Sequence, residues 1–143
     1  MKQLRTAVAC ALLTLSGAAS ADIFDLTLDP KGTVALGGTM LLISGTVTCD
    51  SPNFFFGTSI FGNAIQISVG GKVVSRAFVF GSAQCAGAVE PVPYTLQANT
   101  SGGSPFKPGH ANVSVTAQQF VCTPFGGCNF FTKTVAQNVL LNP

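Results

Sequence analysis

Apolar and polar residues alternate along most of the chain, and this period of two is typical of β-strands with one buried face. The clearest example is residues 39–49, where Leu41, Ile43 and Val47 share one parity with Cys49 and hydroxyl side chains dominate the other. We expect strands at residues 23–28, 39–49, 64–69, 72–80, 92–98, 111–122 and 128–132, with short apolar pieces at 34–36 and 139–141. Glycine- and proline-rich turns separate these segments, so the pattern predicts an all-β antiparallel sandwich of seven to eight strands.

Three expected strands carry more specific signals. Residues 64–69 place Ile65 and Ile67 on one face before a Gly-Gly hairpin turn. Residues 72–80 are apolar on both parities, which leaves open a central strand or one lying beneath a loop. Pro91 and Pro93 flank the start of 92–98 and indicate an edge strand, and the Gly, Ser and Pro content of 99–110 predicts a loop.

The first 21 residues differ from the rest and indicate a cleaved signal peptide. Lys2 and Arg5 precede the apolar run Ala7–Leu15, which is too short to span a bilayer. Ala19-Ser20-Ala21 then matches a small-residue cleavage site, with Asp22 as the new N-terminus. We therefore expect a single domain over residues 22–143 and a secreted, extracellular location, or a periplasmic one in a Gram-negative host.

Removing this segment changes the charge. The whole chain carries a formal charge of +2 with only 8% charged residues. The remaining charged residues are five of each sign: Lys31, Lys72, Arg76, Lys107 and Lys133 against Asp22, Asp25, Asp29, Asp50 and Glu90. A domain without net charge lacks the long-range field that nucleic-acid binding requires, and no apolar stretch of 18 residues follows to predict a membrane span.

Four cysteines remain after Asp22, and an even number in a short exported chain predicts two disulfides. Three connectivities are possible. The segment from Cys122 to Cys128 contains a Pro/Gly turn, so its ends can meet across a hairpin, and this leaves Cys49 to pair with Cys85. The spacing does not fit a zinc site, and we expect no metal and no cofactor.

The order of several segments resembles a family of small exported bacterial immunoglobulin-like domains of unknown function, known mainly from actinobacteria. The matching segments are Gly32–Val34, Gly38–Cys49, Gly81–Gly87 and Phe106–Val113. The resemblance implies an immunoglobulin-like fold and a Cys49–Cys85 disulfide, and it implies no activity. A second similarity, to neocarzinostatin-type apoproteins that hold an apolar chromophore in a cleft, rests on the Cys122–Cys128 ribbon. The other cysteine pair departs from that family, whose second disulfide closes a short hairpin.

Catalytic residues are scarce, and we expect no enzyme activity. His110 is the only histidine and lies in a Pro/Gly corner, where a surface turn residue is the simpler interpretation. A catalytic triad built on His110 needs an aspartate from Asp22, Asp25, Asp29 or Asp50. Asp50 and Glu90 each lie near a cysteine in the sequence, and we expect both to be solvated turn residues.

The aromatic run Phe54-Phe55-Phe56 is the strongest functional signal. Consecutive side chains on a strand point to opposite faces, so at least one of these rings must leave the core. Phe130 and Phe131 pose the same problem. Either a loop or the second sheet covers the rings, or they form an exposed patch for a protein partner or an apolar ligand.

The sequence therefore predicts a secreted, non-catalytic module that acts in binding or in the cell envelope. The first alternative is a carrier of a small apolar ligand in a cleft lined by phenylalanines, and the second is an extracellular enzyme inhibitor that presents residues 122–128. The candidate residues for a ligand or partner are Phe54, Phe55, Phe56, Phe125 and Phe130.

Overall fold

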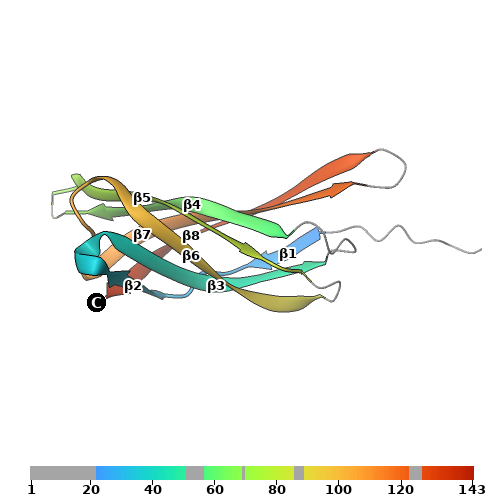
Figure 1. Ribbon diagram of the computed structural model, residues 1–143, viewed down its shortest axis with the longest axis horizontal. Coiled ribbons are helices and arrows are strands. Elements are labelled where there is room, and N and C mark those ends of the chain that lie inside the picture. The colour runs from blue at the N-terminus through green and yellow to red at the C-terminus, as the bar shows by residue number, and fades with distance from the viewer. Residues whose placement is uncertain (1–21, 51–56, 69, 86–88, 123–126) are drawn as a thin grey trace, which may run out of the picture.

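The computed structural model describes residues 22–50, 57–68, 70–85, 89–122 and 127–143 (Figure 1). The expected signal peptide therefore lies outside the described residues. Within them the chain forms β-strands and one short 3-10 turn. Their bounds are β1 Asp22–Leu26, β2 Lys31–Ala35, η1 Leu36–Gly38, β3 Met40–Asp50, β4 Thr58–Ile67, β5 Val73–Ala83, β6 Glu90–Gly103, β7 Gly109–Cys122 and β8 Cys128–Asn142.

The strands form one sheet that closes on itself. Its order is β1-β3-β2-β8-β7-β4-β5-β6, and β6 pairs back onto β3 along ten residues of each strand. On its other side β3 pairs with β2 near Met40 and with β1 near Cys49. A short parallel pairing of β2 with β8, centred on Gly32 and Leu141, completes a ring of seven strands.

The predicted immunoglobulin-like sandwich is therefore wrong, because a seven-strand barrel replaces two separate sheets. Both architectures bury alternate residues of each strand, so the same pattern of apolar positions fits either one. The difference lies in β3, which has a hydrogen-bonded partner on each side and joins β6 to β2. The elongated barrel runs along the horizontal axis of Figure 1.

Several strands are longer than their sequence patterns indicate. Strand β4 begins at Thr58 and not at residue 64, and β6 continues to Gly103, into the segment expected to be a loop. Strand β8 is continuous and joins the two pieces expected at its ends. Pro91 and Pro93 lie where β6 pairs with β3, beyond the register positions that β6 shares with β5.

The barrel interior is filled by aliphatic side chains that the alternation places inward. Leu41, Ile43, Val47 and Leu96 are completely buried, and Val115 reaches the same core from β7. Burial of such side chains contributes about 1.5–3 kcal/mol each. The core therefore accounts for much of the stability of the barrel.

A buried tyrosine on β6 holds the segment that follows β1 in place. Tyr94 lies directly opposite Gly45 in the β3–β6 register, and its hydroxyl donates a 2.5 Å hydrogen bond to the carbonyl oxygen of Thr27. A Cβ atom at Gly45 would lie 2.1 Å from that carbonyl oxygen and 2.6 Å from the hydroxyl oxygen. Glycine is therefore required at this position for the chain segments to approach each other.

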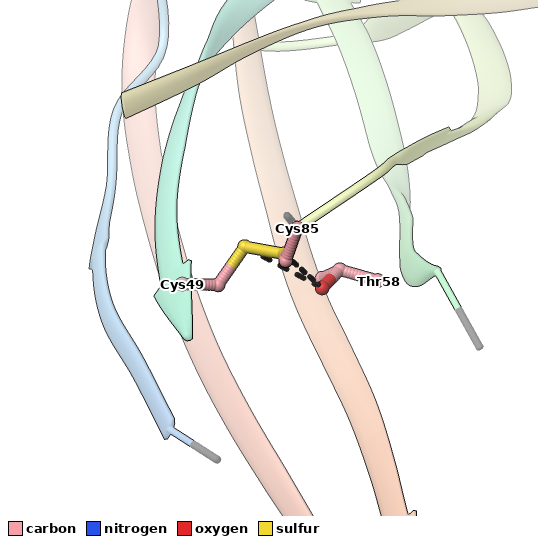
Figure 2. The surroundings of a disulfide bond; sticks show 3 residues. All are labelled: Cys49, Thr58 and Cys85. Atoms are coloured by element: carbon pink, nitrogen blue, oxygen red, sulfur yellow. Dashed lines mark hydrogen bonds between the residues drawn. A yellow bond between two sulfur atoms is a disulfide. The ribbon is translucent and has the colours of Figure 1, made fainter. Parts of the chain in front are cut away.

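Both predicted disulfides are confirmed. Cys49 and Cys85 are buried at one end of the barrel, where the Thr58 hydroxyl lies 3.0 Å from the Cys85 sulfur (Figure 2). Cys122 and Cys128 face each other in the β7–β8 register and close the projecting hairpin. The two bonds stabilise the same end of the molecule.

No helix among the described residues is long and apolar enough to cross a membrane.

Candidate functional site

Three phenylalanines lie on the outer face of β4 and β5. Phe61 pairs with Phe80 in the register, and the ring of Phe61 stacks on the diagonal neighbour Phe78 at 6.4 Å between centroids and 25° between planes. Phe78 is 50% exposed and Phe80 is 61% exposed. We call Phe61, Phe78 and Phe80 the aromatic face.

Strand alternation explains why these rings point outward. The inward positions of β5 are Ser75, Ala77 and Val79, all of them buried. The even-numbered residues between them must then face solvent. The ambiguity in residues 72–80 is resolved in this way: the strand is flanked by β4 and β6, and no described segment buries Phe78 or Phe80.

Strand β4 buries the even-numbered positions, and not the odd-numbered ones that Ile65 and Ile67 suggested. Ile60 and Ala64 are buried, whereas Ile65 is half-buried and Ile67 lies exposed on the outer face. Register places Ile65 opposite Arg76 of β5. The outer face is thus apolar beyond the three rings, toward the β4–β5 turn.

Uncharged polar side chains border the aromatic face. One register row runs from Thr116 on β7 through Phe61 and Phe80 to Gln97 on β6. Arg76 is the one charged residue within the sequences of β4 and β5. An aromatic centre with a polar, uncharged border is the composition typical of the buried core and rim of protein interfaces.

A second aromatic pair lies on the β7–β8 hairpin. Phe120 and Phe130 face each other in the register, with ring centroids 4.6 Å apart. Register pairing of β7 with β4 ends at Gln118, and the hairpin projects beyond it (Figure 1). Phe130, the only residue of the predicted aromatic set that is described, is 64% exposed. Phe54, Phe55, Phe56 and Phe125 lie outside the described residues.

The described surface includes a hollow of about 380 Å³ and another of about 440 Å³, and neither has a phenylalanine in its lining. The smaller one crosses the outer side of β4, β7 and β8 around Asn63, Ser114 and Ala136. The larger one lies between the β4–β5 turn and the loop before β7. Neither hollow is therefore the phenylalanine-lined cleft expected for a carrier of an apolar ligand.

The candidate catalytic residues are spread over the barrel. The His110 ring donates from Nδ1 to the Oδ1 atom of Asn138 at 2.7 Å, because an amide oxygen can only accept. Asp25 and Glu90 lie at the opposite end, paired in register with Thr48 and Cys49. No group of three His, Cys, Asp or Glu side chains that can hold a metal ion occurs among the described residues.

Tyr94 is an ionisable side chain whose pKa is clearly shifted by its surroundings. Burial, and to a smaller extent the negative charge of Asp29, raises the pKa of its hydroxyl far above the usual value of 10. The phenol therefore stays neutral and keeps its hydrogen bond to Thr27 throughout the physiological range. This residue has a structural role and takes no part in the aromatic face.

The sequence signals singled out Phe54–Phe56 and did not single out Phe78 and Phe80. A signal for the latter was present, because Cys85 shares its parity with Val79, and a disulfide with Cys49 requires that parity to face inward. No family model, curated protein or solved structure matches the chain.

Proposed function

We propose that the chain is an exported, non-catalytic binding module that docks on a protein partner through the aromatic face of β4 and β5. The observation that carries this proposal is the exposure of Phe78 and Phe80 beside Phe61 on a folded, disulfide-bonded barrel. Single exposed apolar residues are common, but adjacent aromatic rings on one sheet face are typical of interaction sites.

Export is supported by two features. The first 21 residues have the charge, apolar run and small-residue site of a signal peptide. The two disulfides fit an oxidising compartment, since cytosolic thiols are kept reduced.

The geometry of the aromatic face favours a macromolecular partner over a small ligand. The three rings lie on adjacent strands of one outer face, and the barrel interior beneath them is filled by side chains such as Val79 and Ile60. A surface of this kind gains binding energy when a second surface covers it and removes water from the rings.

The near absence of charge predicts the chemistry of the partner. Its contact surface is apolar and uncharged at the centre, with a hydrogen-bond acceptor or carboxylate opposite Arg76. Association through such a face depends weakly on ionic strength, because long-range attraction between the proteins is small.

Site-specific photo-crosslinking in the organism that makes the protein tests this proposal. A photo-reactive amino acid replaces Ser82, which lies exposed two residues beyond Phe80 on β5, and a control protein carries it at exposed Thr33 on β2. We expect one discrete crosslinked protein from position 82, none from position 33, and loss of the product in the Phe78→Ser/Phe80→Ser variant.

The other outcomes contradict the proposal. Equal products from both positions indicate non-specific contact, and a product made only of two copies of this chain indicates self-association. The Phe120→Ser/Phe130→Ser variant removes two other exposed rings, those of the hairpin, and serves as the matched control. Loss of the product in that variant alone places the interface on the hairpin and overturns the assignment to β4 and β5.

A further inference from the structure

The hollow of about 440 Å³ lies at the end of the barrel opposite the disulfides, between the β4–β5 turn and the loop that leads into β7. Its volume falls within the range of about 300–1,000 Å³ that is usual for small-molecule sites. The aromatic face does not contribute to its lining. It is therefore a separate candidate site, and the argument for it does not depend on the proposed protein partner.

The walls of this hollow are held in place by hydrogen bonds between distant segments. The Gln66 side chain is buried, donates from Nε2 to the Lys107 carbonyl oxygen at 2.8 Å, and accepts from the Lys107 backbone N–H at 2.9 Å. The Ser75 hydroxyl donates to the Pro105 carbonyl oxygen at 3.2 Å. A site whose walls are fixed before a ligand arrives loses little conformational entropy on binding.

A β-bulge shapes the apolar wall. The β4–β5 register passes from Gln66 opposite Ser75 to Ile67 opposite Val73, which leaves Val74 as the extra residue. Bulges redirect side chains, and they are frequent beside functional sites. Val74 and Ile67 line the hollow together with Pro105 and Pro108, so its wall presents aliphatic surface from three segments of the chain.

Lys107 places a positive charge at the same hollow. Lys107 and His110 are part of its lining, and the hydrogen bond to Asn138 fixes the orientation of the His110 ring. The carboxylates of Asp25 and Glu90 lie at the other end of the barrel. A chain with balanced charges after residue 21 thus has a lysine at this hollow, at the end of the barrel away from Asp25 and Glu90.

We propose that this hollow binds a small amphiphilic carboxylate, with its apolar body against Val74 and the two prolines and its carboxylate beside Lys107 and His110. An aliphatic surface favours an apolar body, and the lysine at its border favours a negative group. The combination selects against neutral amphiphiles, which do not pair with the Lys107 ammonium group, and against bare anions, which leave the aliphatic wall in water.

Titration of the purified, oxidised protein with octanoate, followed by two-dimensional ¹H–¹⁵N NMR, tests the site directly. We expect saturable shifts concentrated at residues 66–68, 74–75 and 104–110, and affinities at least about tenfold weaker for octanamide and for inorganic phosphate. Absence of saturable shifts at these residues overturns the proposal. Equal binding of octanamide, or of phosphate, overturns the stated ligand chemistry.

Three variants test the charge of Lys107 and the volume of the hollow separately. Lys107→Gln keeps the hydrogen bonds between the residue 107 backbone and the Gln66 side chain. It weakens the affinity for octanoate by about threefold to fivefold, as expected for an exposed charge contact. Lys133→Gln removes the same charge from β8 far from the hollow, since it pairs with Ala117, and leaves the affinity unchanged. Ser104→Trp fills the hollow without changing charge and abolishes the shifts.

Two results from these variants contradict the site. Equal weakening by Lys107→Gln and Lys133→Gln indicates a general charge effect, and full binding by a folded Ser104→Trp protein places octanoate elsewhere. The shifts in the unaltered protein test the site even if one of these variants fails to fold.

Discussion

The raised pKa of Tyr94 predicts a specific dependence of stability on pH. Tyr94 is the only tyrosine in the chain, so its ionisation is a spectroscopically isolated event. In the folded protein burial raises the pKa of the phenol and keeps it neutral, whereas in the unfolded chain the tyrosine ionises near its usual pKa of about 10. The folded state then retains a proton that the unfolded state loses, and the free energy of unfolding falls as the pH rises above 10.

The expected size follows from the linkage between proton binding and stability. Above pH 10 the tyrosine is ionised in the unfolded chain and neutral in the folded one. The free energy of unfolding then falls by about 1.4 kcal/mol for each pH unit. Below pH 10 the hydroxyl contributes its hydrogen bond to Thr27, which is worth about 1–1.5 kcal/mol. The Tyr94→Phe variant loses this bond but also loses the pH dependence, so the two proteins become equally stable near pH 11.

Guanidinium unfolding measured by circular dichroism at a series of pH values gives the two stability curves. Absorbance at 295 nm reports phenolate formation in the same samples. We expect phenolate to appear only together with loss of the native circular dichroism signal. Titration of Tyr94 near pH 10 in a protein that remains folded, or parallel curves for Tyr94→Phe and the unaltered protein, refutes the buried, hydrogen-bonded tyrosine.

Three further predictions follow from the packing. Gly45→Ala destabilises the protein by about 3 kcal/mol, because the new Cβ overlaps the Thr27 carbonyl, while Ser44→Ala on the same strand changes stability by less than about 0.5 kcal/mol in the same denaturation assay. Replacing Cys49 and Cys85 by alanine lowers stability by about 4 kcal/mol and replacing the Cys122–Cys128 pair by about 2 kcal/mol, since the longer loop gains more entropy when opened; equal losses contradict this. Phe80→Ser changes the melting temperature little, because most of the ring already lies in water, and a large decrease shows that the ring is packed.

Local sequence signals were sufficient to predict an all-β chain and the two disulfides. Cys49 is inward because it shares the parity of Leu41, Ile43 and Val47, and all four side chains are completely buried. The Pro/Gly turn between Cys122 and Cys128 indicates a hairpin, and the register places the two cysteines opposite each other. These features depend on neighbours within a few residues, and sequence patterns describe such neighbours well.

Closure of the barrel had no comparable local signal. It depends on β3 pairing with β6, about fifty residues away in the register, and on a three-residue parallel contact between β2 and β8. Neither pairing changes the alternation within any strand, so a sandwich and a barrel predict the same pattern. The prediction that Ile65 and Ile67 face the core was wrong for a related reason, because these apolar side chains lie on the outer face of β4.

The sequence predicts the aromatic face only if the Cys49–Cys85 disulfide is taken into account. Residues 72–80 are apolar on both parities, and the pattern alone does not tell which set is buried. The Cys49–Cys85 bond fixes Val79 inward and therefore Phe78 and Phe80 outward. The hollow beside Lys107 gave no sequence signal, because it arises from a bulge and from hydrogen bonds between segments about forty residues apart.

Hydroxyl-radical footprinting tests the central claim, that the barrel exposes an aromatic face which a partner covers. Oxidation of the peptide containing Phe78 and Phe80 is measured by mass spectrometry in the free protein and in the complex isolated by crosslinking at position 82. We predict strong oxidation of both rings in the free protein and protection in the complex, with unchanged oxidation of Phe130. Rings that resist oxidation in the free protein, or that remain equally reactive in the complex, contradict the account.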